Sequence, residues 1–245
     1  MNRLKKKIRE NAANNKKLHE FKRDYKKFEL LQSKNPRFIL SWDDRYPILN
    51  ERTINTHFDT HYIYHPAWAA RVLAQTKPDF HVDISSTLNF CTLVSAFLPV
   101  KFYDFRPAKI NLAGLQAGRA DLTHLLFSDE SIKSLSCMHV VEHIGLGRYG
   151  DELDPDGDKK AIKELKRVVM KNGNLLFVVP VGQQPIIRFN AHRIYTYDQV
   201  ISLFSEFNLI NFALVDDSGS FFVDSDKTMA DKQKYGCGCW WFVRK

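Results

Sequence analysis

Three carboxylates stand near the ends of successive segments in the middle of the chain. Asp83 ends a short apolar run, Asp104 ends the next one, and Asp121 follows a polar stretch that contains glycine. Asp104 lies 21 residues after Asp83, the spacing at which a nucleotide-binding sheet places a carboxylate on ribose hydroxyls. The spacing therefore predicts a ribose site. The alternative is that Asp104 only starts a turn and that Asp121 is an ordinary loop acid.

A second polar group follows the apolar run 132–138, in the sequence His139-Val-Val-Glu142-His143. A histidine close to a reacting hydroxyl can remove its proton as a general base. His143 and His192 are therefore the candidate catalytic bases, with Glu142 as a residue that orients one of them. The alternative is structural for each: Glu142 then braces loop amides, and the histidines serve in packing.

The same segment matches the pattern H-x-x-E-H of inverted zincin peptidases. A zinc site there would need both histidines on a helix, a third protein ligand and a water. His139 directly follows a strand-like run, and Gly145 and Gly147 would end a helix at once, so a peptidase is not expected. Cys237-Gly-Cys239 lacks two further ligands and is predicted to be a turn that enters the last strand. No metal site is predicted.

Alternating strands and helices from residue 80 onward must position these residues. Continuous apolar runs such as 175–179 are typical of strands buried on both faces. A helix over 158–170 is expected to begin with Asp158 as its N-cap and to stop at a turn, Lys171-Asn172-Gly173. The alternation predicts an α/β fold with a doubly wound, mostly parallel sheet, whose ligands bind beyond the carboxyl ends of the strands. The other strands are expected at 80–84, 100–103, 132–138, 210–215 and 240–244, and the other helices at 66–75, 89–97 and 197–207.

The order of residues from Asp83 to Gly173 resembles the class I S-adenosylmethionine-dependent methyltransferase family. Within that family the chain is most similar to small-molecule methyltransferases, a group that includes uncharacterised members from surface-polysaccharide gene clusters. The resemblance covers residues 80–245. It is carried by the segments CMHVVEHIGLG (137–147), AIKELKRVVMKNGNLLFVVPVG (161–182) and HRIYTYDQVISLFSEFNLINFALV (192–215).

This resemblance implies a Rossmann-like methyltransferase fold with S-adenosylmethionine as the cofactor. It puts Asp83 at the acid position of the first strand, Asp104 on the ribose and Asp121 on the adenine side. The cofactor-binding residues that it implies are Asp83, Ser85, Ser86, Asp104, Asp121, Leu122, Met138 and His139.

The loop after the first strand departs from the family pattern. The family has glycines there, because its backbone approaches the cofactor closely and adopts positive φ. This chain has Ser85, Ser86, Thr87 and Asn89 instead. Two interpretations remain: the side chains hydrogen-bond the cofactor, with Asn tolerating left-handed φ, or they fill its pocket.

The net charge of +8 comes from the N-terminal arm. Residues 1–34 contain twelve Lys and Arg against four Asp and Glu, and the rest of the chain is balanced, so no nucleic-acid partner is expected. Residues 3–33 contain no Pro or Gly and suit a helix. This helix is predicted to pack on the rest of the chain, to contact an anionic membrane surface, or to meet a partner helix or RNA. Its apolar face is formed by Leu18, Phe21, Tyr25, Phe28 and Leu31.

Composition points to a globular chain in a reducing compartment. Hydrophobic residues make up 44% of the chain, and four cysteines are too few for a disulfide scaffold. No stretch approaches the ~18 apolar residues of a membrane span, and residues 1–30 lack the apolar core of a signal peptide. The expected location is cytoplasmic, with peripheral contact at the inner membrane face as an alternative. Three parts are expected: a basic helical arm (1–35), an aromatic-rich cap or linker (36–79) and a methyltransferase-like domain (80–245).

The resulting hypothesis is methyl transfer from S-adenosylmethionine to a small-molecule or glycan-type acceptor. One alternative is a cofactor-free module that docks a partner or a membrane. Another is an enzyme of glycan biosynthesis that uses a nucleotide-sugar. Residues 58–66 are crowded with His and Tyr, and they are expected either to cover a pocket as a lid or to pack with their polar tips outward.

Overall fold

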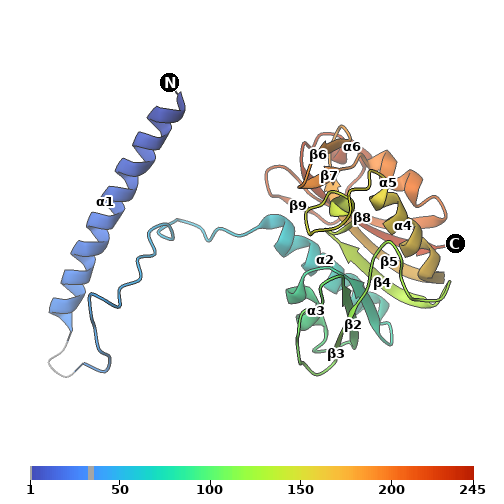
Figure 1. The fold of residues 1–245 in the computed structure, drawn as a ribbon, viewed down its shortest axis with the longest axis horizontal. Coiled ribbons are helices and arrows are strands. Elements are labelled where there is room, and N and C mark those ends of the chain that lie inside the picture. Colours follow the sequence, from blue (N-terminus) through green and yellow to red (C-terminus); the bar gives the residue numbers. More distant parts are fainter. Residues whose placement is uncertain (1, 33–35) are drawn as a thin grey trace. The chain divides into compact units, whose positions relative to one another are not determined.

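The computed structural model describes residues 2–32 and 36–245, without the side chains of residues 2–12. The chain divides into two compact units, residues 1–58 and 59–245. Figure 1 shows the first as a long helix with the loop after it, and the second as a sheet with its helices. The expected linker 36–79 is thus shared between the units, which divide just before Asp59. Among the described residues, no helix is both long and apolar enough to cross a membrane.

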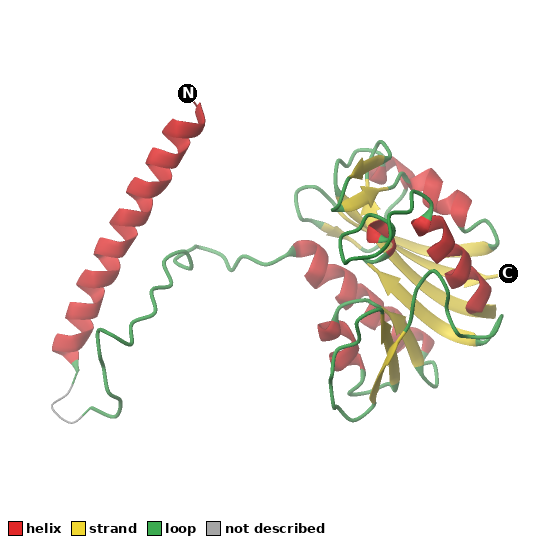
Figure 2. Ribbon diagram, in the orientation of Figure 1, coloured by secondary structure: helices red, strands yellow, loops and turns green. Residues whose placement is uncertain are grey.

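The first unit is helix α1 (Asn2–Leu31) and the irregular chain that follows it. The helical arm predicted from the sequence is confirmed, and its predicted end at residue 33 lies outside the described residues. Trp42 lies edge to face against Tyr25, with ring centroids 4.9 Å apart, and Arg52 pairs with Asp24 at 2.5 Å. The loop drawn in green after α1 in Figure 2 therefore packs on the helix face that carries Tyr25.

The second unit is built on one mixed sheet. Its strands are β1 (His81–Ile84), β2 (Val100–Asp104), β3 (Leu115–Arg119), β4 (Ile132–Met138), β5 (Val169–Val181), β8 (Phe207–Val215), β9 (Phe221–Phe222) and β10 (Gly236–Arg244). Their order is β3-β2-β1-β4-β5-β10-β8-β9. The pairs from β3 to β5 are parallel, whereas β10 runs antiparallel to β5 and β8. A separate antiparallel hairpin joins β6 (Ile186–Arg188) to β7 (His192–Ile194).

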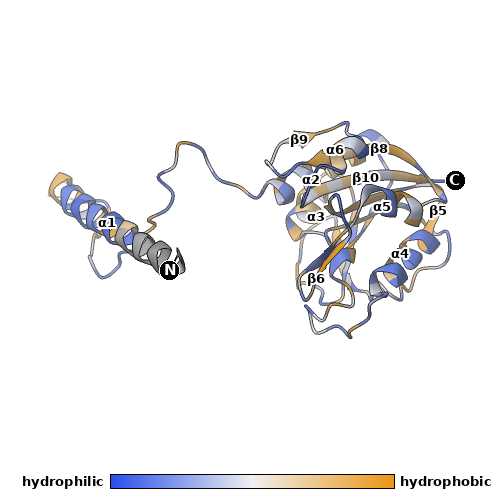
Figure 3. Cartoon of the chain, turned by 90° about the horizontal axis from the view of Figure 1, so that it is seen from above, coloured by the Kyte–Doolittle hydropathy of each residue, from blue (hydrophilic) through white to orange (hydrophobic). Residues whose placement is uncertain are grey.

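Helices cover both faces of this sheet. They are α2 (Thr60–Thr76), α3 (Leu88–Val94), α4 (Gly157–Val168), α5 (Tyr197–Leu203) and α6 (Lys227–Ala230), with a 3-10 turn η1 (Val141–His143) after β4. On one face α2 and α3 pack through Trp68 and Phe90; on the other, α4 and α5 pack through Ile162 and Val200. Figure 3 shows hydrophilic residues along the visible surface of α4 and hydrophobic residues in the sheet. The expected doubly wound, mostly parallel α/β fold is confirmed.

The junction between α4 and β5 differs from the sequence prediction. The helix ends at Val168, and Val169 already pairs with Ile132 of β4. Lys171-Asn172-Gly173 is therefore not a turn between elements but an irregularity inside β5, where Asn172 takes a φ of +59°. Asp158 is also not the N-cap: it lies in the first turn of α4, where its Oδ2 accepts a hydrogen bond from the Tyr195 hydroxyl at 2.8 Å.

One strand was missed, and the turn predicted at 237–239 was wrong. Strand β3 was missed because its residues are mostly exposed and form no apolar run. Strand β10 begins at Gly236, so Cys237-Gly-Cys239 lies inside the strand and is not a turn. Gly238 is needed there because a Cβ would come within 2.2 Å of the Trp240 ring.

Candidate functional site

The loop after β1 contains a residue with positive φ although it has no glycine. Ser85 has a φ of +59°, and its amide donates a hydrogen bond to Tyr103 O of β2 at 2.7 Å. Ser86 Oγ accepts a hydrogen bond from the Met138 amide of β4 at 3.0 Å. The loop is therefore tied to the strands on both sides of β1, and its serines carry part of that connection.

Asp83 belongs to a buried polar chain that crosses β1 and β4. Its Oδ1 accepts the Ser86 amide at 3.0 Å, and Ser136 Oγ donates to its Oδ2. His81 places Nε2 2.8 Å from Ser136 Oγ and Nδ1 2.8 Å from Ser134 Oγ. Burial raises the pKa of Asp83 to about 6, although the serines lower it, and burial lowers the pKa of His81 to about 3. Asp83 thus serves to link two strands.

The eight residues implied for cofactor binding fall into two sets. Ser85, Asp104 and Asp121 reach the surface, and the other five are buried: Asp83, Ser86, Leu122, Met138 and His139. Asp104 Oδ1 accepts the Arg106 amide at 2.7 Å, and Asp121 Oδ1 accepts the Thr123 amide at 2.8 Å. Within the described chain, each of these two carboxylates keeps an Oδ2 that accepts no hydrogen bond.

A cluster of titratable side chains lies at the carboxyl end of β4, where the first turns of α2 pack against it. Asp59 caps α2, its Oδ1 accepting the Tyr62 amide at 3.1 Å, so that His61 and His65 lie one turn apart on the same helix. The His139 ring contacts three rings of α2: its centroid is 5.7 Å from that of His61, 5.4 Å from Tyr62 and 5.0 Å from His65. Residues 58–66 are therefore mostly helix, and the first turns of α2 cover the end of β4.

Tyr235 extends this group toward the β6–β7 hairpin. Its ring stacks on His61 at 5.3 Å and lies 4.8 Å from the ring of His192. We call His61, Tyr62, His65, His139, His192 and Tyr235 the imidazole cluster. Burial lowers the pKa of His61 to about 4 and raises that of Tyr62 to about 12, so both side chains are neutral at neutral pH.

Glu142 joins the imidazole cluster to the predicted base His143. Its Oε1 lies 2.7 Å from His139 Nδ1 and 3.8 Å from His143 Nε2. Burial lowers the pKa of His139, but the Cys237 sulfur and the Glu142 carboxylate outweigh it and raise that pKa to about 10. Glu142 Oε2 is buried and has no hydrogen-bond partner in the described chain. A buried carboxylate with a free oxygen can bind a donor supplied by a ligand.

The two predicted bases are both neutral imidazoles. His143 Nδ1 donates to Ala191 O at 2.6 Å, which leaves Nε2 with the lone pair. His192 Nε2 is buried and has no partner among the described residues. Burial lowers the pKa of both rings. Each therefore has an unprotonated nitrogen at neutral pH, as a general base requires.

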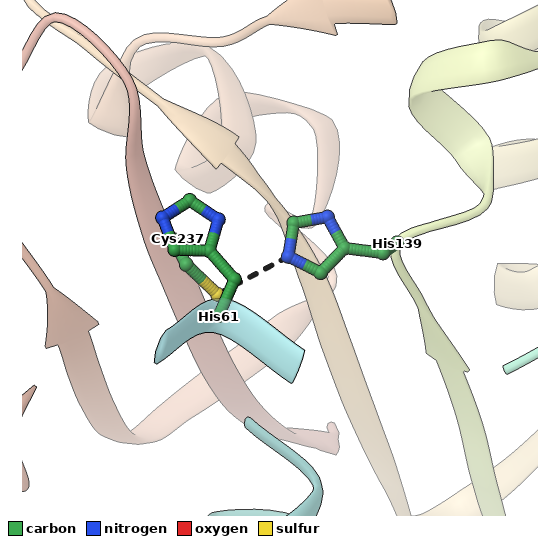
Figure 4. A group of neighbouring side chains, drawn as sticks. All are labelled: His61, His139 and Cys237. Atoms are coloured by element: carbon green, nitrogen blue, oxygen red, sulfur yellow. Dashed lines mark hydrogen bonds between the residues drawn. The ribbon is translucent and has the colours of Figure 1, made fainter. Parts of the chain in front are cut away.

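Cys237 brings β10 into the same place. Its Sγ lies 3.3 Å from His139 Nε2, and Sγ, His139 and His61 each offer one ligand atom within 4.8 Å of the others. Figure 4 shows the three side chains facing one another from α2, the end of β4 and β10.

Comparisons with known proteins identify the fold. Residues 127–236 match a family described as "Caenorhabditis protein of unknown function, DUF268". No curated protein matches the chain. Among solved structures, the cyclase SpnF is similar with a TM-score of 0.52 and 11% identity, over 73% of this chain and 80% of that one. N-methyltransferase NodS from Bradyrhizobium japonicum WM9, solved with S-adenosylhomocysteine, gives a TM-score of 0.51 and 12% identity, over 74% and 85%. The fold is the class I methyltransferase fold.

A third similar structure is the 1,6-didemethyltoxoflavin-N1-methyltransferase of Burkholderia thailandensis. It has a TM-score of 0.50 and 8% identity, over 74% of this chain and 79% of that one. Because one of the three neighbours is named a cyclase and two are named methyltransferases, the methyltransferase fold by itself leaves the reaction open.

Two arginines and one tyrosine lie beside His143. The Arg106 and Arg148 guanidinium groups lie 4.8 Å and 5.2 Å from the ring centroid of Tyr149, and the Tyr149 ring lies edge to face with His143 at 5.8 Å. Arg193 of β7 is buried and donates to Ile144 O at 2.6 Å, so its role is structural.

The sequence patterns pointed to Glu142, His143, His139 and His192 but not to the side chains that surround them. His61, His65, Tyr235 and Cys237 meet these residues only through tertiary contacts. One local signal was available: Asp59 before a helical run predicts an N-cap, which would have started α2 early enough to bring its histidines onto one helix.

Proposed function

We propose that the chain transfers a methyl group from S-adenosylmethionine to a small, negatively charged acceptor. The observation that carries the proposal is the pair Ser85 and Asp104 in a methyltransferase fold. Ser85 keeps the left-handed φ of +59° that such a loop otherwise obtains from glycine. Asp104 stands at the end of the adjacent strand with a free carboxylate oxygen.

The accessible residues fit the cofactor in part. Asp104 would accept hydrogen bonds from the ribose hydroxyls, and Asp121 would face the adenine. The Ser85 backbone lies where a cofactor could approach closely. When bound, S-adenosylmethionine supplies an activated methyl group, and transfer then depends mainly on alignment of the acceptor. The chain's own part would be to hold the acceptor and to take its proton on His143 Nε2 or His192 Nε2.

The acceptor is proposed to carry a phosphate or carboxylate group. Arg106 and Arg148 converge on Tyr149 beside His143, and guanidinium groups bind such anions in bidentate fashion. A phosphorylated or acidic glycan precursor has this chemistry, which agrees with the glycan-type acceptor suggested by the sequence.

Calorimetric titration of the full chain tests the cofactor directly. S-adenosylmethionine, S-adenosylhomocysteine and a nucleoside diphosphate are titrated separately, and we expect the first two to bind. Asp104→Asn removes the charge that strengthens the ribose hydrogen bonds and should raise Kd at least ~10-fold, given ~1.5–3 kcal/mol for such a bond. Asp79→Asn, an exposed residue just before β1, is the matched control and should leave Kd unchanged. Binding of the diphosphate alone would point instead to a nucleotide-sugar enzyme.

A cofactor-free module is the second candidate, and a specific observation favours it. Ser86 Oγ already accepts a hydrogen bond from the Met138 amide. Three other residues implied for cofactor binding are buried: Asp83, Met138 and His139. In this alternative the side chains occupy the space that glycines leave open. Folded protein that binds neither S-adenosylmethionine nor its product in the titration would refute methyl transfer and support this module.

The arm is proposed to contact an anionic membrane surface. Phe28 is 62% exposed and Leu31 is 73% exposed on α1, the helix that lies within the basic segment 1–34. Apolar residues and lysines on one helix bind anionic lipid headgroups. Deletion of residues 1–34 should reduce cosedimentation with phosphatidylglycerol vesicles, while binding to neutral phosphatidylcholine vesicles stays low in both proteins. Unchanged binding to anionic vesicles would remove this proposal.

A further inference from the structure

The side chains of His61, His139 and Cys237 have the chemistry and the spacing of a transition-metal site. We propose that they bind one Zn²⁺-class divalent metal ion, with a fourth coordination position open toward solvent. The inference concerns metal binding alone and does not depend on methyl transfer.

The spacing of the three ligand atoms supports this site. Bonds of ~2.0–2.3 Å to nitrogen and sulfur in a tetrahedral site place neighbouring ligand atoms about 3.5 Å apart. His139 Nε2 and Cys237 Sγ already lie 3.3 Å apart. The three ligand atoms lie within 4.8 Å of one another, so a shift of about 1 Å by a side chain completes the set. The ligands come from three separate elements, as Figure 4 shows.

Glu142 orients one ligand in the way that metal sites commonly use. Its Oε1 lies 2.7 Å from His139 Nδ1, and a carboxylate only accepts, so Nδ1 carries the hydrogen. Nε2 is then the atom that faces Cys237. A histidine that binds zinc typically donates its other N–H to a carboxylate in this arrangement.

Two unsatisfied atoms beside the ligands form a second observation. Glu142 Oε2 and His65 Nε2 are both buried, and neither has a hydrogen-bond partner within the described residues. His65 donates from Nδ1 to His61 O at 2.7 Å, so its Nε2 holds a lone pair. Buried polar atoms are nearly always paired, and a water or ligand on the metal would supply such partners.

The ligand types select the class of ion. Two imidazoles and a thiolate suit Zn²⁺ or Co²⁺, whereas Mg²⁺ and Ca²⁺ prefer oxygen ligands. On binding, the metal replaces two protons, the one on the Cys237 thiol and the one on His139 Nε2, and both pass to the buffer. The metal then takes the lone pair that His139 Nε2 regains and the lone pair that His61 already has. His61 is only partly buried, so the fourth position faces the accessible side of the cluster. Three protein ligands and one open position are the arrangement of catalytic zinc sites.

Titration of the full chain with Co²⁺ after chelator treatment tests the proposal. We expect one equivalent to bind, with the charge-transfer absorption of a cobalt–thiolate bond, and Zn²⁺ to displace it. Cys237→Ala should abolish this absorption, and Cys239→Ala should keep it. Cys239 is the matched control, because it lies on the same strand face and its Sγ is 3.9 Å from Cys237 Sγ. Glu142→Gln should weaken Co²⁺ binding about 10–100-fold.

His61→Gln provides an independent test of the metal site if a Cys237 variant fails to fold. His61 is near the surface, so its replacement should leave the circular dichroism spectrum unchanged and weaken Co²⁺ binding at least ~100-fold. His124→Gln, at an exposed position, should bind as the wild type does. The proposal is overturned if the wild-type chain shows no thiolate absorption with excess Co²⁺. It is also overturned if the absorption survives in Cys237→Ala, is lost in Cys239→Ala, or is unchanged in a folded His61→Gln chain.

Discussion

Nδ1 of His139 lies 2.7 Å from Oε1 of Glu142, and both side chains are buried. His139 takes a φ of +56°, a left-handed backbone conformation uncommon for a residue other than glycine. The chain just after β4 is thus held in an unfavourable backbone conformation. In this conformation the His139 ring contacts the carboxylate of Glu142, three residues further along the chain. Such outliers are retained where surrounding contacts impose them, often at functional sites.

Replacement of Glu142 should separate its hydrogen-bonding role from its charge. Glu142→Ala removes the acceptor for the buried His139 N–H, so we expect the free energy of unfolding to fall by about 3–5 kcal/mol. Glu142→Gln keeps an acceptor oxygen and should cost only about 1–2 kcal/mol. Urea denaturation of the metal-free proteins measures both values. Equal losses in the two variants would mean that the hydrogen bond to His139 contributes little.

Ser85 and Ser86 should respond in opposite directions to replacement by glycine. Ser85→Gly relieves a left-handed backbone that costs an L-residue about 1–2 kcal/mol, which offsets the greater flexibility of glycine in the unfolded chain. We expect no loss of stability, or a gain of up to about 1 kcal/mol. Ser86→Gly removes the acceptor of the Met138 amide and should cost about 1–3 kcal/mol. The midpoints of urea unfolding of the two variants are compared with that of the wild type. A shift of the same sign in both variants would contradict the prediction.

Those parts of the fold that are buried on both faces could be predicted from the sequence. The run 132–138 matches β4 residue for residue, and every side chain in it except Lys133 is buried, as is typical of a central parallel strand. Strand β3 escaped detection because its side chains mostly face solvent and show no apolar period. The start of β10 was not predicted because Cys237-Gly238-Cys239 is typical of a turn. Pairing with β5 and β8, and the Trp240 ring beside Gly238, impose an extended conformation on this segment instead.

The candidate site could be predicted only where its residues are neighbours in sequence. Glu142 and His143 follow β4 directly, so the fold rule for strand ends identifies them. Cys237 lies 98 residues after His139, and no spacing rule joins the two. From the sequence, the zincin-like pattern and the cysteine pair were each rejected as metal sites because each lacked further ligands. The fold brings His139 of the first and Cys237 of the second together with His61.

The second unit should fold without the first. The division between the units falls before Asp59, whose side chain caps α2. A chain that starts at Asp59 should keep the free energy of unfolding of the second unit within about 0.5 kcal/mol, measured by urea denaturation with circular dichroism. In this shortened chain, Asp59→Ala should cost about 1 kcal/mol through loss of the cap. Asp79→Ala, at an exposed position, should cost less than about 0.5 kcal/mol. An insoluble or unfolded product would show that the units are interdependent.

Gly145 and Gly150 form a matched pair in the loop after η1. Both have positive φ, +77° and +82°, but a Cβ on Gly145 would lie 2.1 Å from Asp154 O, whereas a Cβ on Gly150 meets nothing within 4 Å. Gly150→Ala should therefore cost only the backbone strain, about 1–2 kcal/mol. Gly145→Ala should cost at least about 3 kcal/mol, because the backbone of the loop must also move. Thermal unfolding of both variants checks this, and similar losses would mean that the loop adjusts freely.

The buried carboxyl of Asp83 should make stability fall as pH rises. Its pKa is about 6 in the folded chain, raised by burial from an ordinary value of 3.8. Between about pH 4 and 6 the folded state therefore holds a proton that the unfolded state has released, and stability declines across this window. A shift of about two pKa units corresponds to about 3 kcal/mol at most. Asp83→Asn should remove this decline, measured by urea denaturation at pH 4, 5, 6 and 7.

The free energy of unfolding of Asp83→Asn must be compared with that of the wild type at each pH, because His81 also makes stability depend on pH. Its pKa is lowered to about 3 by burial, so the unfolded state binds the extra proton below about pH 6.5, and this contribution makes stability rise with pH. His81 is present in both proteins, and subtraction of the wild-type curve leaves the contribution of Asp83. The stability of Asp83→Asn relative to wild type should thus grow from pH 4 to pH 6 and then stay constant. A difference that is flat over this range would mean that the carboxyl ionises in the folded chain as easily as in water, and that Ser136 and the Ser86 amide fully compensate its burial.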